Sequence, residues 1–190
     1  KRLRSVLMLA ACEFAGGDAK QALPYACAME YIHTYSLIHD DLPCMDDDDL
    51  RRGKPTNHKV YGEDVATLAG DALLNYAYET ALEAFSYDCN EDEKCGAQTD
   101  RIIKALKVLG RKAGIYGMVG GQVKDVEATE NNEQLDKDTL QFIYDLKTGA
   151  LLEASMVIGA ILAGAKDEEV TKTESIASKI GMAFQIQDDI

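Results

Sequence analysis

The fold class is decided by the stretch Val65-Ala66-Thr67-Leu68-Ala69-Gly70-Asp71-Ala72-Leu73-Leu74-Asn75-Tyr76-Ala77. Apolar side chains recur in it at i, i+3, i+4 and i+7, which is the spacing of one buried stripe on an α-helix. We predict that this stripe consists of Val65, Leu68, Ala69, Ala72, Leu73, Tyr76 and Ala77. Because no alternating strand pattern of useful length occurs elsewhere, the sequence predicts an all-α fold.

Helical periodicity continues on both sides of this stretch, and punctuating residues mark the ends of the helices. Gly16-Gly17 can end the first helix, Pro24 suits the first turn of the second, and Leu42-Pro43 stops it. Asp136 can cap the fifth helix, and 90–94 reads as a polar connection. We therefore expect one domain over 1–190, with helices at about 2–15, 20–42, 63–86, 99–114, 136–164 and 170–190.

Composition excludes several classes of function. The chain is 46% hydrophobic, which is enough for one core, and its formal charge of −13 disfavours binding to a nucleic-acid backbone. We find no run of eighteen apolar residues and no charged-then-apolar leader, so we expect no membrane span and a cytoplasmic location. The cysteines are odd in number and lack CxxC spacing, which predicts reduced thiols. They are Cys12, Cys27, Cys44, Cys89 and Cys95.

Polar residues interrupt three of the expected apolar faces. On the second helix, His33 and Asp40 share a face with apolar residues because they are seven positions apart. Lys147 sits in the middle of the stripe on the fifth helix, and Gln185 and Asp188 end the stripe on the last helix. Since a buried unpaired charge is costly, we expect the three faces to border one polar cavity.

The most acidic segment is Asp40-Asp41-Leu42-Pro43-Cys44-Met45-Asp46-Asp47-Asp48-Asp49. Neighbouring carboxylates about 4 Å apart repel by about 1–4 kcal/mol per pair, so such clustering favours a bound cation. Oxygen ligands select ions such as Mg²⁺, which completes its shell with water and substrate phosphates. Arg51, Arg52 and Lys54 follow at once, and guanidinium groups match phosphate oxygens bidentately. The segment predicts a site for a diphosphate.

These residues resemble the first aspartate-rich motif of the trans-isoprenyl diphosphate synthases, with Asp40-Asp41-x4-Asp46 followed by 51–55. Lys1-Arg2-Leu3-Arg4 resembles the end of a substrate segment of that family, Lys147-Thr148-Gly149 resembles its Lys-Thr-Gly, and 185–189 resembles the start of its second aspartate motif. The resemblance implies an isoprenoid synthase-type helical bundle around a central cavity. It also implies that the bundle is incomplete at both ends and forms a homodimer.

The resemblance further implies a Mg²⁺-dependent condensation of isopentenyl diphosphate with an allylic diphosphate. Its metal ligands, which would hold three Mg²⁺ ions on the allylic diphosphate, would be Asp40, Asp41, Asp46, Asp188 and Asp189. Four residues, Arg51, Lys147, Thr148 and Gln185, would contact the allylic diphosphate and support its ionisation. Another four, Lys1, Arg4, His33 and Arg52, would bind isopentenyl diphosphate.

Product length depends, in that family, on residues just before the first Asp. Tyr35 and Ser36 occupy these positions, and the bulky Tyr35 favours a farnesyl product, with geranylgeranyl as the alternative. Ideal helix geometry places Tyr35 about 140° away from Asp40, so periodicity alone does not direct Tyr35 toward the cavity.

Other interpretations stay open at this point. A terpene cyclase shares the ionisation chemistry but needs no second diphosphate site, and a non-catalytic subunit would be expected to lose an aspartate motif. The acidic run 46–49 could be a solvated face, His33 a core histidine, and Lys147 a partner of Asp145. Gly120-Gly121-Gln122 and Asp125 receive no role from the sequence.

Overall fold

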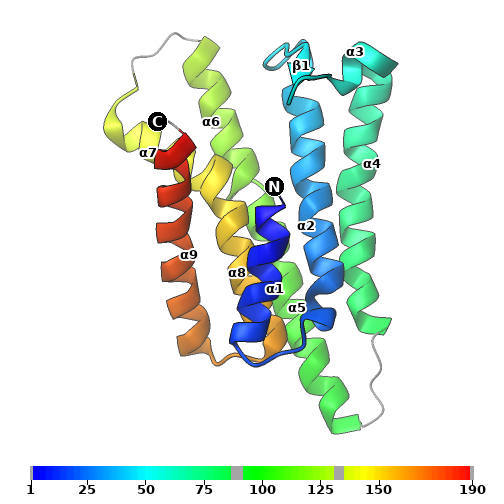
Figure 1. Ribbon diagram of the computed structural model, residues 1–190, viewed down its shortest axis with the longest axis vertical. Coiled ribbons are helices and arrows are strands. Elements are labelled where there is room, and N and C mark those ends of the chain that lie inside the picture. Colours follow the sequence, from blue (N-terminus) through cyan, green and yellow to red (C-terminus); the bar gives the residue numbers. More distant parts are fainter. Residues whose placement is uncertain (1, 87–91, 131–134, 189–190) are drawn as a thin grey trace.

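The computed structural model describes residues 2–86, 92–130 and 135–188; the side chains of 92–95, 130 and 185–188 lie outside the description. Long helices lie side by side along the longest axis of the molecule, which confirms the all-α prediction (Figure 1). They are α1 (Leu3–Phe14), α2 (Ala19–Asp40), α4 (Glu63–Leu82), α5 (Asp92–Ala113), α6 (Met118–Glu130), α8 (Ala150–Ala163) and α9 (Asp167–Asp188). Short elements join them: the hairpin of β1 (Leu50–Arg51) and β2 (Lys54–Pro55), α3 (Asn57–Tyr61), the 3₁₀ turn η1 (Glu83–Ser86), α7 (Lys137–Ile143) and the π-helical turn η2 (Tyr144–Gly149).

Helix ends follow most of the expected signals. Gly16 has a positive φ of 84° just after α1, and the Asp136 carboxylate accepts a hydrogen bond from the backbone N–H of Thr139 at 2.7 Å. In the same way Asp18 caps α2, which starts one residue earlier than predicted, so Pro24 lies inside the helix rather than in its first turn. The polar connection predicted at 90–94 was wrong in part, because α5 is one continuous helix over Asp92–Ala113.

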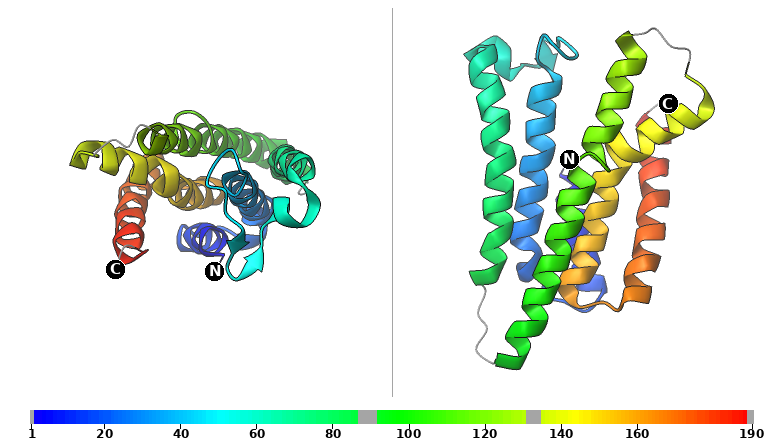
Figure 2. Two further views of the ribbon diagram at one scale, coloured as in Figure 1. Left: turned by 90° about the horizontal axis from the view of Figure 1, so that it is seen from above. Right: turned by 180° about the vertical axis from the view of Figure 1, so that it is seen from behind.

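Helix α8 lies in the middle of the bundle and packs against α1, α2, α5 and α9 (Figure 2). Eleven of its fourteen residues are buried. At Gly159 a Cβ atom would lie 2.2 Å from the carbonyl oxygen of Met8, so only glycine allows α1 and α8 to approach this closely. The run 137–163 is long and apolar enough to span a membrane by length and composition alone. Within the bundle 61% of its most apolar stretch is buried, and a core helix has the same length and composition.

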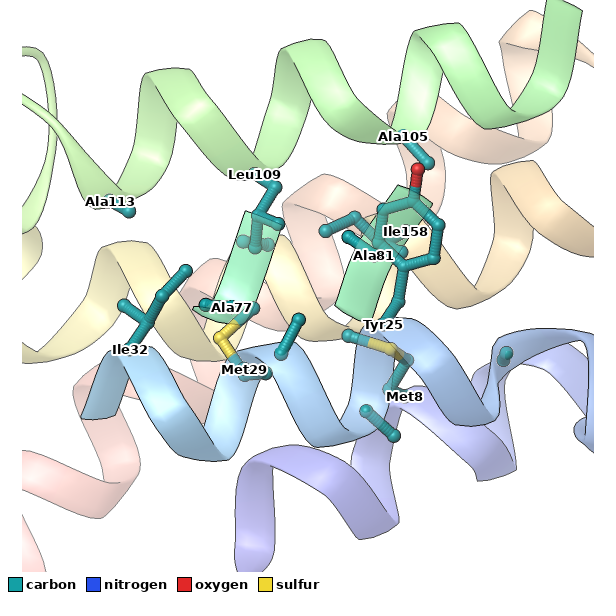
Figure 3. Close-up of a cluster of buried hydrophobic side chains, with 14 of the residues drawn as sticks. Met8, Tyr25, Met29, Ile32, Ala77, Ala81, Ala105, Leu109, Ala113 and Ile158 are labelled. Carbon is teal, nitrogen blue, oxygen red and sulfur yellow. The ribbon is translucent and has the colours of Figure 1, made fainter. Parts of the chain in front are cut away.

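The hydrophobic core joins α1, α2, α4, α5 and α8 (Figure 3). Fully buried large side chains alternate in it with alanines, and the small residues let the helices pack closely. Tyr25 is completely buried; its hydroxyl donates to the carbonyl oxygen of Ile102 at 2.8 Å, and burial raises the pKa of Tyr25. The bond satisfies the polar end of a side chain that otherwise packs as a core residue.

The stripe predicted on α4 is buried only in part. Ala77 is buried, but Val65 is 47% exposed, Leu68 66% and Tyr76 48%. Helix α4 packs against α2, and its buried residues are small: Ala66, Gly70, Ala77, Thr80 and Ala81. Because α4 lies at one side of the bundle (Figure 2), Val65, Leu68 and Tyr76 remain exposed, while Leu73, Leu74 and Tyr78 pack against the core.

Candidate active site

A cavity of about 590 Å³ opens where α2, α6 and the π-helical turn meet. Its polar wall includes His33, Asp40, Lys147 and Thr148, and α6 supplies mostly apolar lining. The predicted convergence of α2 with the helix that carries Lys147 is therefore confirmed. The apolar lining comprises Leu37, Leu42, Met45, Met118, Val119, Val123, Val126 and Leu151.

Asp40 is the last residue of α2 and is partly buried. Burial raises the pKa of its carboxyl group to about 6, with Lys147 acting in the opposite direction and Asp46 adding to the rise. The backbone N–H of Asp46 donates to the carbonyl oxygen of Asp40 at 2.9 Å, so the turn brings these residues together. A bound cation would offset both burial and repulsion, and Mg²⁺ therefore fits this pair of carboxylates.

Lys147 reaches the cavity from η2, a π-helical turn of the kind that often marks functional sites. Its ammonium group pairs with Asp125 of α6, with Nζ and Oδ2 2.5 Å apart. Asp145, the partner considered from the sequence, instead accepts a hydrogen bond from Gln141 at 2.8 Å. Sequence reasoning missed Asp125 as a partner of Lys147 because the two residues belong to different helices.

A second pocket, of about 770 Å³, adjoins the first and shares Arg4, His33, Leu37 and Thr148 with it. Arg52 also lines this pocket, so three of the four residues predicted for isopentenyl diphosphate lie together; Lys1 is outside the described residues. Sequence reasoning missed two charged residues of the lining, Arg2 and Glu30.

His33 stands between the two pockets. Burial and the nearby Arg4 lower the pKa of its imidazole to about 4, while Glu30 acts in the opposite direction. The ring is therefore neutral at pH 7 and can donate one hydrogen bond to an anion without carrying charge. Burial also lowers the pKa of Arg4.

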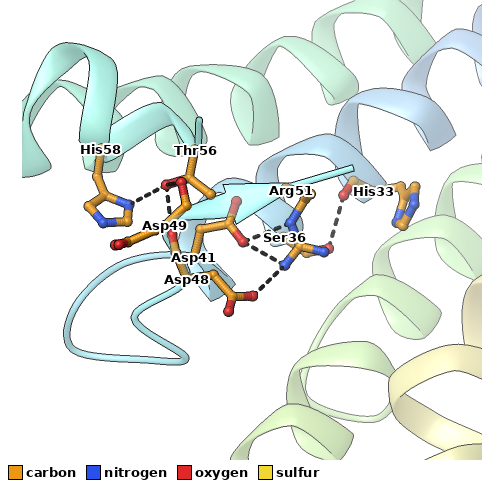
Figure 4. Close-up of polar contacts among 8 residues, drawn as sticks. All are labelled: His33, Ser36, Asp41, Asp48, Asp49, Arg51, Thr56 and His58. Atoms are coloured by element: carbon orange, nitrogen blue, oxygen red, sulfur yellow. Dashed lines mark hydrogen bonds and ion pairs between the residues drawn. The ribbon is translucent and has the colours of Figure 1, made fainter. Parts of the chain in front are cut away.

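The hairpin after the acidic segment is held by ion pairs (Figure 4). Arg51 donates from Nε to Asp41 at 2.7 Å, its terminal nitrogen lies 2.5 Å from the same carboxylate, and Asp48 follows at 3.6 Å. Asp41 is only 3% exposed. In this structure Asp41 and Arg51 contact each other and line neither pocket, and their predicted contacts with metal and diphosphate stay predictions.

A separate group in the same loop could also hold a cation. The group consists of Asp47, Asp49 and His58, whose ligand atoms all lie within 4.8 Å of one another. His58 had not been identified from the sequence. Asp49, however, pairs with Lys59 at 2.6 Å. Asp48 and Asp49 thus make the surface contacts that the sequence left open for them.

Tyr35 and Ser36 both line the main cavity, beside Asp40. Tyr35 is 8% exposed, and its ring meets that of His39 edge-on with centroids 5.7 Å apart. Burial raises the pKa of Tyr35. The aromatic side chain therefore forms part of the cavity wall, and its role in product length stays a prediction. Helix α9 contributes Phe184 to the second pocket. The side chains of Gln185 and Asp188, and the whole of Asp189, lie outside the described residues.

The helical bundle thus places a carboxylate and a lysine in one pocket and arginines in an adjoining one. The family model for polyprenyl synthetase matches residues 1–190, and the chain belongs to this family of trans-isoprenyl diphosphate synthases. The family relationship confirms the resemblance that the aspartate motifs indicated.

Relatives of the chain include a chloroplastic geranylgeranyl pyrophosphate synthase of Capsicum annuum. It is 52% identical over 190 residues, which cover 100% of this chain and 49% of the relative. A dimethylallyltranstransferase of Fischerella ambigua is 50% identical, and the match covers 100% of this chain and 52% of that relative. Among solved structures, an FPP/GFPP synthase from Zymomonas mobilis has a TM-score of 0.87 and 40% identity, covering 99% of this chain and 64% of that one. The chain thus spans about half the length of the curated relatives.

Proposed function

We propose that the protein lengthens an allylic diphosphate by head-to-tail condensation with isopentenyl diphosphate, in a Mg²⁺-dependent reaction. The observation that carries this proposal is the pair of adjoining pockets. One presents Asp40 and Lys147 beside an apolar wall, and the other presents arginines together with the neutral His33. A terpene cyclase would need only the first pocket.

The residues support the chemistry as follows. Mg²⁺, when bound, would neutralise charge on the departing diphosphate. Lys147 would stabilise the same group as the allylic C–O bond breaks and its electron pair leaves with the diphosphate. Leu42 and Leu151 in the cavity wall would exclude water from the resulting carbocation. The double bond of isopentenyl diphosphate then forms the new C–C bond, and a proton passes to the departed diphosphate.

For the product, two lengths are supported by different observations. Several relatives at 50–52% identity are named geranylgeranyl synthases, which favours a twenty-carbon product. Tyr35 in the cavity wall favours the fifteen-carbon farnesyl product instead. We propose geranylgeranyl diphosphate as the product, with farnesyl diphosphate as the second candidate.

The proposal extends to cofactor, assembly and location. Asp40, Asp46 and the aspartates at 188 and 189 would hold three Mg²⁺ ions, which would neutralise charge on the allylic diphosphate. The outward apolar face of α4 supports a homodimer. We keep the cytoplasmic location as a proposal, although several relatives are named chloroplastic.

The test is incubation of the purified protein with isopentenyl diphosphate and, in turn, dimethylallyl, geranyl and farnesyl diphosphate. We expect prenyl diphosphates that are identified by mass with Mg²⁺ and disappear with EDTA. A longest product of twenty carbons supports geranylgeranyl synthesis, and a stop at fifteen supports the farnesyl alternative. Absence of any product from all three allylic substrates would overturn the proposed function.

A further inference from the structure

Asp125 is a charged residue of α6 to which the sequence gave no role. Its carboxylate Oδ2 lies 2.5 Å from Nζ of Lys147, and the two side chains are each about one-third exposed, at 33% and 30%. Lys147 lines the main cavity, whereas Asp125 is not among the residues of the cavity wall. The side chain of Asp125 therefore contacts Lys147 and does not itself form part of the cavity wall.

The backbone around this pair holds α6 close to the turn that carries Lys147. A Cβ atom at Gly121 would lie 2.4 Å from the backbone nitrogen of Lys147 and 2.8 Å from Cβ of Leu146. Gly121 is four residues before Asp125, so both lie on the same side of α6. Glycine at this position brings α6 within reach of η2, and the contact fixes where the carboxylate of Asp125 meets the ammonium of Lys147.

A lysine side chain left alone samples many rotamers, and ordering it costs free energy each time it must act. A carboxylate at 2.5 Å restricts the ammonium group before any ligand arrives. The same carboxylate also competes with an anionic ligand for that ammonium group. We propose that Asp125 is a positioning residue, which holds Lys147 in the geometry that diphosphate departure requires and weakens diphosphate binding in the ground state.

This inference rests on the proposed function for its catalytic part, and it makes a distinctive prediction. A purely structural residue would lower activity and ligand affinity together when it is replaced. Asp125→Asn should instead lower kcat by about 10-fold to 100-fold, since a misplaced group loses much of its effect. Affinity for inorganic diphosphate with Mg²⁺ should stay the same or rise by about 2-fold to 5-fold, because a competing carboxylate has gone.

The matched control is Asp145→Asn, which makes the same change of charge two residues from Lys147. The carboxylate of Asp145 accepts a hydrogen bond from Gln141 instead of pairing with Lys147. We would measure kcat and KM by product mass, diphosphate affinity by calorimetry, and Tm for both variants. Asp125→Glu, whose carboxylate can still reach Lys147, should restore much of the kcat. Asp145→Asn should change kcat and affinity less than about 2-fold.

A double-mutant cycle keeps the proposal falsifiable if Asp125→Asn lowers stability. If Asp125 acts through Lys147, Asp125→Asn should change diphosphate affinity little in a Lys147→Ala background. Equal effects in both backgrounds, equal effects of the two Asn variants, or parallel loss of kcat and affinity would each overturn the inference. If the unaltered protein forms no prenyl product, the proposed function fails, while the affinity cycle still decides whether Asp125 controls Lys147.

Discussion

Asp40 bears an electrostatic cost that the nearby cations Lys147 and Arg51 offset only in part. The Asp40 carboxyl group is partly buried and near Asp46, and its pKa is raised to about 6. Most stable folds would not place an acid there without a full partner. The raised pKa of Asp40 is evidence that this position serves binding rather than stability.

Asp40→Asn is therefore expected to stabilise the metal-free protein at neutral pH. The folded pKa of about 6 exceeds the ordinary 3.8, so the folded state binds more protons between these values and stability falls as the pH rises through them. The full shift corresponds to at most about 3 kcal/mol, and partial exposure reduces the expected gain to about 1–2 kcal/mol. Unfolding in EDTA at pH 7.5 should show this gain, and at pH 3.5 it should nearly vanish. An equal gain at both pH values would contradict the electrostatic explanation.

A second prediction for a single residue concerns Tyr35 and the length of the product. It lines the cavity and is 8% exposed, so Tyr35→Ala removes most of an aromatic side chain from the wall. We expect the main product to lengthen by at least one five-carbon unit, together with a stability loss of about 3–5 kcal/mol. The control is Tyr31→Ala, because Tyr31 lies on the same helix but packs against Tyr76. Product masses should shift only for Tyr35→Ala; an unchanged product would remove Tyr35 from the length control.

At the scale of elements, periodicity predicted the long apolar helices and missed α6. Met118–Glu130 has a weak apolar pattern and contains Gly120-Gly121, which lower helix propensity. Helix α6 forms because it packs against η2, and periodicity within one segment cannot predict a contact with another segment. The same limit explains Tyr35: ideal spacing directs it away from Asp40, yet both residues line the same cavity.

Gly121→Ala tests whether the packing of α6 on the π-helical turn is required. The new Cβ atom would meet the backbone of Lys147, which cannot move aside as a flexible side chain would. We expect a stability loss of about 1–3 kcal/mol and weaker diphosphate binding, measured by thermal unfolding and calorimetry. Gly96→Ala on α5 is the control, since nothing lies within 4 Å of its Cβ position. That variant should gain about 0.5–1 kcal/mol from helix propensity. Equal stability of both variants would contradict the close-packing argument.

At the scale of the whole molecule, the exposed face of α4 shows what periodicity alone cannot decide. The sequence predicted that Val65, Leu68, Tyr76 and Ala77 belong to one buried stripe, and this was wrong for all but Ala77 of these four. It could not tell whether that stripe meets the same chain or another one. Within this chain Ala66, Gly70, Ala77 and Ala81 are buried, whereas Val65, Leu68 and Tyr76 remain exposed.

We expect a second copy of the chain to cover this face, so Leu68→Glu should convert a dimer into a monomer. Leu68 is 66% exposed and lies in the middle of the apolar stripe on α4, where a buried carboxylate would lack a partner. The dimer Kd should rise at least about 100-fold, as measured by light scattering across a dilution series. Ile103→Glu is the control, because Ile103 is an exposed apolar residue of α5, at 40%, on a different helix. Dissociation by Ile103→Glu alone would move the interface to α5, and a monomeric unaltered protein would exclude the dimer. Because Leu68 lines neither pocket, a monomeric variant that still binds diphosphate would separate assembly from the site.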